Sequence, residues 1–229
     1  MMGESNQGQC ALKESCQPSE DTALHNLERR LGDPSTMLHW YDFLCPFCYI
    51  AQARTAILVR HGLEVIELPF QAHTNIPPEG LLAGPRIGPM YDNLAREARN
   101  AGLPLNWNPY LPNTRVVLAA AEWVRRHQPE AFAGFHRDIF EAHFVLGENL
   151  GDLAVIDRHA SNRNINLIAL HVALDDGSAV AAVAASETLA RKYGVRSTPA
   201  WLLANQLISG LLPASEFTRL AEYAQALPR

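Results

Sequence analysis

The chain has 229 residues, 48% of them hydrophobic and 19% charged, which is enough apolar material for the core of a globular protein. Its formal net charge is −5 and no basic patch is evident, which argues against nucleic acid as a partner. The apolar runs are far too short to span a membrane, and residues 1–20 lack the apolar core and cleavage site of a signal peptide. We therefore expect a cytoplasmic protein with no membrane partner, whose cysteines are thiols for much of the time.

Residues 1–33 are predicted to form an N-terminal tail. Residues 1–18 are dominated by polar side chains and glycine, so we expect them to be disordered. Cys10 and Cys16 fall in this stretch, and we interpret them as exposed thiols without a function. Residues 19–31 are compatible with a short packing helix, because three leucines share one face and a glycine follows.

The strongest pattern in the chain is an apolar strand that runs into a Cys-x-x-Cys motif. Residues 37–44 are apolar and aromatic without Gly or Pro, which predicts a buried strand. Pro46 suits the first position of a helix over residues 46–60. Cys45 then lies at the helix N-terminus, where free N–H groups and the helix dipole stabilise a thiolate. Cys48 lies one turn further on, with its sulfur within reach of Cys45.

This arrangement predicts redox chemistry, with Cys45 as the nucleophile and Cys48 as the resolving thiol, because a thiolate is the species that attacks disulfides. Half of a zinc site is an alternative, but a second cysteine pair or histidine pair at the usual spacing is missing from the sequence. A structural disulfide or a buried thiol pair is the other alternative. We expect no metal at these cysteines.

Two polar residues near the motif have two interpretations each. Asp42 either caps the turn into the helix or helps proton transfer, and we favour the cap. His73 stands at the start of a long loop over residues 71–89, which is rich in Pro and Gly. It is either a surface histidine or a proton shuttle, since histidine titrates near neutral pH.

The predicted elements continue with a strand over residues 63–70, which completes a β–α–β unit with a parallel strand pair. From about residue 90 to 173 the pattern is helical, and individual helices fit residues 91–103, 115–127, 129–144 and 152–160. The aromatic residues of this block are expected to form its core: Trp107, Trp123, Phe132, Phe135 and Phe140.

His136 and His143 are seven residues apart on one predicted helix. We expect both to be partly exposed on a shared face. A third ligand beside them is not evident in the sequence, so we do not interpret them as a metal site.

The C-terminal part is predicted to form a helix, a β-hairpin and a second helix. An alanine-rich helix is predicted over residues 178–193, and two short apolar runs around Asn205–Gln206 predict a β-hairpin. Pro199 begins the first of these strands, where proline is tolerated at an edge. A last amphipathic helix fits residues 214–227.

The order of these elements resembles the thioredoxin superfamily, and within it the DsbA-like group that carries an inserted helical domain. The motif Cys45-Pro46-Phe47-Cys48-Tyr49 resembles the C-P-W-C-Y of FrnE-type members, and the segment Pro112-Asn113-Thr114-Arg115 is similar to that subgroup as well. Gly194-Val195-Arg196-Ser197-Thr198-Pro199 resembles the G-V-x-x-[VT]-P segment of the family. The resemblance begins near residue 36.

This resemblance implies an α/β, thioredoxin-like fold with an inserted all-helical domain. Residues 34–85 would form the first part of the thioredoxin-like domain, residues 86–173 the inserted helical domain, and residues 174–229 the second part of the thioredoxin-like domain. The helical block would then interrupt one sheet, whose two halves pair with each other.

The resemblance also implies a protein disulfide oxidoreductase that acts on protein or small-molecule disulfides through Cys45 and Cys48. It implies a cis Thr198–Pro199 bond beside the motif, and it places Pro46, Phe47, Thr198 and Pro199 at the substrate. Phe47 departs from the Pro-His of strongly oxidising members, because it offers the thiolate neither charge nor hydrogen bond. The dithiol stores the electrons, so no metal or organic cofactor is expected, although glutathione is a possible co-substrate.

Two other functions are compatible with the pattern. The first is a glutathione-dependent transferase or isomerase, of the related group that contains kappa-class glutathione transferases and 2-hydroxychromene-2-carboxylate isomerases. Those proteins usually carry Ser at the position of Cys45 and need no second cysteine, so the sequence favours the redox function. The second is a holdase-like polypeptide binder with an idle Cys-x-x-Cys. The partner is expected to be a disulfide-containing polypeptide or glutathione, and the protein a monomer or homodimer.

Overall fold

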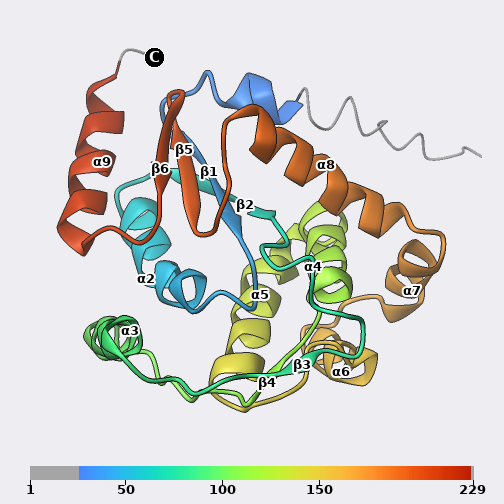
Figure 1. Ribbon diagram of the computed structural model, residues 1–229. Coiled ribbons are helices and arrows are strands. Elements are labelled where there is room, and N and C mark those ends of the chain that lie inside the picture. The colour runs from blue at the N-terminus through green and yellow to red at the C-terminus, as the bar shows by residue number, and fades with distance from the viewer. Residues whose placement is uncertain (1–25, 228–229) are drawn as a thin grey trace, which may run out of the picture.

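The computed structural model describes residues 26–227, and Figure 1 shows them as a mixed sheet surrounded by helices. Its four strands have the order β2-β1-β5-β6. Strand β1 (Thr36–Tyr41) pairs in parallel with β2 (Glu64–Pro69) and antiparallel with β5 (Ala200–Leu203). Strand β6 (Gln206–Ser209) completes the sheet antiparallel to β5. The prediction that two distant halves of the chain build one sheet is therefore confirmed.

The central strand β1 is buried on both faces, because helices cover the sheet from each side. Met37 contributes to an apolar cluster with α2 (Pro46–Arg60) and α9 (Ala214–Ala226). Leu38, its neighbour, points the other way into a cluster with α8 (Ser178–Lys192). This alternation is the period of a β-strand, and it fixes which helix covers which face.

Residues 26–30 are helical, and Leu27 and Leu31 pack into the same cluster as α8, so the described part of the predicted N-terminal helix has a packing role. Cys10 and Cys16 lie outside the described residues, as does the rest of the predicted tail.

Five helices follow between β2 and α8, in agreement with the predicted helical block, although α7 lacks an individual counterpart among the predicted helices. They are α3 (Pro89–Asn100), α4 (Arg115–His127), α5 (Pro129–Phe144), α6 (Leu153–Asn162) and α7 (Leu167–Asp175). A ribbon of two short strands, β3 (Leu81–Leu82) and β4 (Tyr110–Leu111), joins the long loop to the segment before α4. The domain boundaries stay predictions.

The core of the helical block contains Trp123, Phe135 and Phe140 as predicted, with Phe132 packed against it at partial burial. Phe140 also reaches the sheet domain, since its ring lies 4.9 Å from that of Phe43. The two parts of the molecule therefore share one apolar cluster.

The expectation of partial exposure for His136 and His143 is wrong, because both are buried, with 6% and 2% of their surface exposed. The ring of His136 stands edge-on to Tyr41 at 4.4 Å. Burial lowers the pKa of each histidine to about 4, so both are neutral near pH 7. Across residues 26–227, His, Cys, Asp and Glu side chains form no cluster of three or more suited to a metal ion.

The hairpin turns one residue earlier than predicted. Ala204 and Asn205 occupy its centre, both with positive φ, at 46° and 64°. Two central residues with φ > 0 match the right-handed twist of the flanking strands, and Asn accepts that conformation readily.

Within the described part of the chain, we find no single helix that is both long and apolar enough to cross a membrane. Helices α7 and α8 pass that test of length and composition only as a pair, bent by 71° between them.

Candidate active site

The two cysteines of the motif occupy different environments at the start of α2. Cys45 is the N-cap residue, with an extended backbone, and Pro46 follows as the first helical residue. The side chain of Cys45 is 9% exposed and that of Cys48 is 1% exposed. Neither sulfur is in a disulfide. Cys45 is thus the sulfur nearer the surface, as predicted.

The pKa values of the two cysteines differ as well, and the more exposed Cys45 is the more acidic. The pKa of Cys45 is lowered, mainly because the Cys48 thiol donates a hydrogen bond to its sulfur, and burial opposes this effect. The pKa of Cys48 is raised well above its usual value, mainly by burial and then by the neighbouring Cys45. The shared proton therefore resides on Cys48, and the negative charge develops on Cys45.

Thr198 and Pro199 lie beside the motif despite their distance along the chain. The peptide bond between them is cis. In the thiol form, Cys45 Sγ donates to the carbonyl oxygen of Thr198 at 3.3 Å. Pro199 is buried at the start of β5, and Thr198 is half-buried. The structure thus brings both predicted segments together at one end of the central strands.

A cleft of about 580 Å³ opens onto Cys45. Pro46, Phe47 and Thr198 line it, whereas Pro199 is buried and is not a lining residue. The remaining lining residues come from the turn before Cys45, the loop after β2, the segment around β3 and the start of α3, the stretch up to β4, the end of α5 and the turn before Thr198. They are Leu44, Ala72, His73, Asn75, Ile76, Leu81, Arg86, Met90, Tyr91, Trp107, Asn108, Leu111, His143, Phe144, Arg196 and Ser197. A lining that combines apolar and aromatic walls with polar side chains is compatible with a small-molecule site.

The comparisons with known proteins agree with this geometry. The model of the DsbA-like thioredoxin domain family matches residues 36–224. The chain belongs to the DsbA-like thioredoxin family. A search of curated proteins by sequence found no match to this DsbA-like protein.

Solved structures show the same fold at low identity. A probable DsbA oxidoreductase from Streptomyces coelicolor has a TM-score of 0.72 at 19% identity, covering 85% of this chain and 91% of that one. A 2-hydroxychromene-2-carboxylate isomerase has a TM-score of 0.63 at 18% identity, with coverage of 83% and 94%. The cytosolic disulfide reductase DsbM from Pseudomonas aeruginosa, solved with GSH, has a TM-score of 0.57 at 18% identity, with coverage of 83% and 96%.

In this DsbA-like protein Asp42 is fully buried and holds the turn before α2. Its carboxylate accepts hydrogen bonds from the backbone N–H of Leu44 at 3.1 Å and of Ala72 at 2.7 Å. Burial raises the pKa of Asp42, and these hydrogen bonds oppose the shift. The expected cap of the turn is confirmed. The N-cap residue of helix α2 is Cys45, whose side chain makes no capping hydrogen bond.

His73 follows Ala72, is exposed, and lines the cleft. Its interpretation as a surface histidine is confirmed, and the alternative of a proton shuttle stays a hypothesis.

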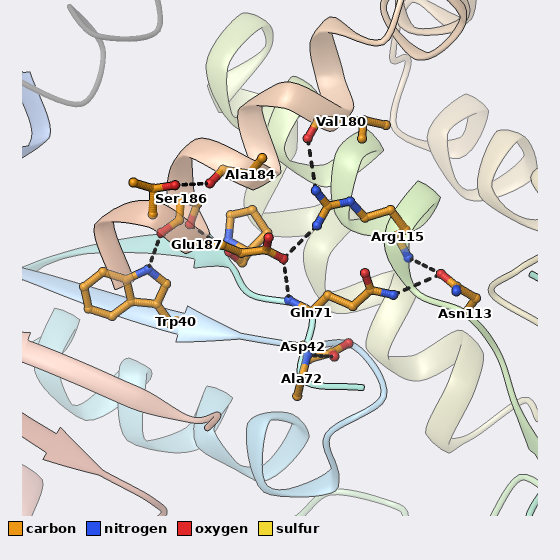
Figure 2. A network of polar contacts seen from close by, with 12 residues as sticks. Trp40, Asp42, Gln71, Ala72, Asn113, Arg115, Val180, Ala184, Ser186 and Glu187 are labelled. Atoms are coloured by element: carbon orange, nitrogen blue, oxygen red, sulfur yellow. Dashed lines mark hydrogen bonds and ion pairs between the residues drawn. The ribbon is translucent and has the colours of Figure 1, made fainter. Parts of the chain in front are cut away.

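A polar network holds the loop that follows β2, as Figure 2 shows. Asn113 accepts from the side chain of Gln71 at 3.0 Å and donates to the carbonyl of Ile76 at 2.6 Å. Glu187 on α8 accepts from the backbone of Gln71 at 3.2 Å and from Arg115 at 2.7 Å. The segment Pro112-Asn113-Thr114-Arg115 therefore fastens a wall of the cleft to two helices.

Sequence reasoning missed Trp107 and Arg86 as residues of the cleft. Trp107, expected in the core, is half-buried and lies in the cleft wall with its ring edge-on to Tyr91 at 5.2 Å. Arg86 lies against both rings. One signal could have identified it, because Arg86 is the only charged residue between positions 81 and 90.

Proposed function

We propose that this protein is a thiol–disulfide oxidoreductase whose redox pair is Cys45 and Cys48. The observation that supports this most is the asymmetry of the pair: Cys45 opens to the cleft with a lowered pKa, while Cys48 is buried with a raised pKa. A nucleophile needs the thiolate and access, and a resolving thiol needs protection until the first bond has formed.

The reaction proceeds in two exchanges. The Cys45 thiolate attacks one sulfur of the substrate RS–SR, forms a mixed disulfide, and releases one RS⁻. Cys48 then loses its proton and attacks the Cys45 sulfur, which forms the Cys45–Cys48 disulfide and releases the second RS⁻. Two electrons pass from the protein dithiol to the substrate, and two protons end on the released thiols. The reverse sequence oxidises a substrate dithiol.

The residues around the sulfur position the substrate. Thr198 offers a backbone carbonyl that already contacts Cys45 Sγ, and formation of the thiolate frees this acceptor for a donor on the substrate. Pro46 and Phe47 provide an apolar surface beside the nucleophile, and the buried Pro199 follows Thr198 directly before β5.

No organic cofactor or metal is required, because the dithiol itself carries the electrons. We propose glutathione as a co-substrate that returns the pair to the dithiol state. Support comes from the fold shared with DsbM, which was solved with GSH, although the low identity limits that support to the fold.

Trapping the intermediate tests this proposal. Cys48→Ala should retain attack by Cys45 but stop at the mixed disulfide, so mass spectrometry should find one substrate thiol attached to Cys45. Cys45→Ser should give no adduct and no turnover. A glutathione-dependent isomerase or transferase would instead keep its activity in Cys48→Ala, and a polypeptide binder would keep its binding in Cys45→Ser. Isomerase or transferase activity retained in Cys48→Ala, or disulfide exchange that is no faster with the unmodified protein than with Cys45→Ser, would overturn the redox function.

A further inference from the structure

Arg86 is a cation in the cleft without a matching anion. It stands between β3 and α3, and its guanidinium carbon lies 5.8 Å from the ring centre of Tyr91 and 5.7 Å from that of Trp107. Its Nη1 donates to the Tyr91 hydroxyl at 3.4 Å, a long hydrogen bond. Its Nε is buried and has no hydrogen-bond partner. Within residues 26–227, we find no carboxylate paired with Arg86.

The rest of the cleft has the same sign of charge. Arg196, which precedes Thr198 by two positions, is a second cation in the lining, and it is exposed. Among the described residues that line the cleft, none is Asp or Glu. This is unusual in a chain whose formal net charge is −5. The cleft is therefore the place where an anion is attracted to an otherwise acidic protein.

A buried guanidinium N–H that makes no hydrogen bond is costly, and a ligand that accepts this bond removes the cost. The planar fork of arginine matches a carboxylate, and contact with aromatic rings orients the fork. Arg86 and Cys45 line one cavity, so one small ligand can meet both of them.

We propose that Arg86 is a specificity-determining residue that binds a carboxylate on the substrate, and that the substrate is a low-molecular-weight disulfide bearing that carboxylate. The inference rests on the proposed function and names its substrate class. The chemistry is unchanged: the protein dithiol gives two electrons and two protons to the disulfide, which leaves as two thiols. Arg86 holds the carboxylate and takes no part in the exchange.

A matched pair of disulfides tests this inference. Dithiodipropionate carries a carboxylate on each half, and dithiodipropionamide has nearly the same shape without charge. We would mix the reduced full-length protein with each compound and measure the second-order rate constant from the released thiol. For the unmodified protein we expect a rate constant about tenfold higher for the dianion, which corresponds to about 1.4 kcal/mol.

Three variants assign the preference to one side chain. Arg86→Gln should bring the ratio of the two rate constants close to one, and Arg86→Lys should restore part of it by keeping the charge without the fork. Arg99→Gln is the matched control, because it removes the same charge from an exposed position at the far end of α3. It should keep the ratio of the unmodified protein. Circular dichroism of each variant verifies the fold.

The possible failures are distinguishable. Equal rate constants in the unmodified protein, or an unchanged ratio in Arg86→Gln, would overturn the inference while Cys45-dependent turnover leaves the proposed function standing. If the unmodified protein consumes neither disulfide faster than Cys45→Ser does, the proposed function is wrong. Titration of Cys45→Ser with dithiodipropionate, followed by tryptophan fluorescence, then decides the anion site alone. The site is supported if dithiodipropionate gives a saturable change in fluorescence, while dithiodipropionamide gives none and the added Arg86→Gln substitution removes it. Lack of a saturable change with dithiodipropionate overturns the site.

Discussion

Two parts of the cleft lining are built in opposite ways. The part that holds the cysteine sulfur atoms, the sulfur side, lies where buried strands end: Cys45 follows β1, and Thr198 precedes β5. The part that carries the unpaired cation is the segment around β3 and the start of α3, where Leu82 is 83% exposed and Ile87 is 78% exposed. Thiol exchange needs sulfur atoms held in place by packed backbone, whereas recognition can reside on a segment with few buried contacts.

The largest expected difference concerns stability. Phe140 is fully buried and packs its ring against Phe43 and His136, at 4.9 Å and 5.0 Å. We expect Phe140→Ala to lower the free energy of unfolding by about 3–5 kcal/mol, because it leaves a cavity where the two parts of the molecule meet. Trp107→Ala, at the half-buried cleft wall, should cost about 1 kcal/mol. Urea unfolding followed by circular dichroism measures both. Equal losses would mean that the wall is part of the core.

The buried histidines give the next effect, a dependence of stability on pH. Burial lowers the pKa of His136 and His143 to about 4, whereas histidine in an unfolded chain titrates near 6.5. Between these values the unfolded state binds protons that the folded state excludes. Stability is therefore complete above about pH 6.5 and falls as the pH falls, by about 3 kcal/mol for each histidine at pH 4.

Urea unfolding at a series of pH values between 7 and 4 measures this loss. His136→Phe retains an aromatic ring against Tyr41 and removes one titrating group, so its stability should fall less steeply over that range. If the free energy of unfolding of His136→Phe falls with pH as steeply as that of the unmodified protein, His136 binds a proton in the folded state as readily as in the unfolded state.

Disruption of the polar network of Figure 2 should have a smaller effect on stability, and it should also lower the rate of the reaction in the cleft. Asn113→Ala removes the hydrogen bonds to Gln71 and Ile76 and should cost about 1–3 kcal/mol. Because these bonds hold the cleft loop, the rate constant for small disulfides should fall as well. Asn100→Ala, at the exposed end of α3, is the control and should change stability by less than about 0.5 kcal/mol. A stable Asn113→Ala variant with an unchanged rate would show that the loop holds without this clamp.

The sequence predicted the sulfur side of the site better than the part around Arg86, for a physical reason. An apolar strand that runs into a Cys-x-x-Cys at a helix start is a local pattern with strict backbone requirements, so Cys45 could be placed from the residues alone. Thr198 could be placed beside it only because the chain resembles a known family. Arg86 and Trp107 stand in irregular segments, where no periodicity indicates which way a side chain points. Their meeting depends on the ribbon between β3 and β4, whose two-residue strands are too short for a recognisable pattern.

His136 shows a different limit of sequence reasoning. Its helix has the right period, but polarity alone suggested the wrong face, because the histidine stands among aromatic rings that shield a neutral imidazole. Only the packing of α5 against β1 decides its burial.

The smallest predicted effect lies within the sulfur side itself. Ionised Asp42 raises the pKa of Cys45, although it stands on the turn that places this residue. Asp42→Asn removes the charge and should therefore lower the pKa of Cys45 further. The rate at which iodoacetamide alkylates Cys45, followed by mass spectrometry of the Cys45 peptide and measured against pH in a Cys48→Ala background, reports the pKa of Cys45 in that background. Adding Asp42→Asn to this background should move the midpoint to lower pH. Asp92→Asn removes an exposed carboxylate from α3 and should leave the midpoint in place. A shift to higher pH in Asp42→Asn would mean that Asp42 acts on Cys45 through the geometry of the turn, because the amide cannot accept both backbone hydrogen bonds as the carboxylate does.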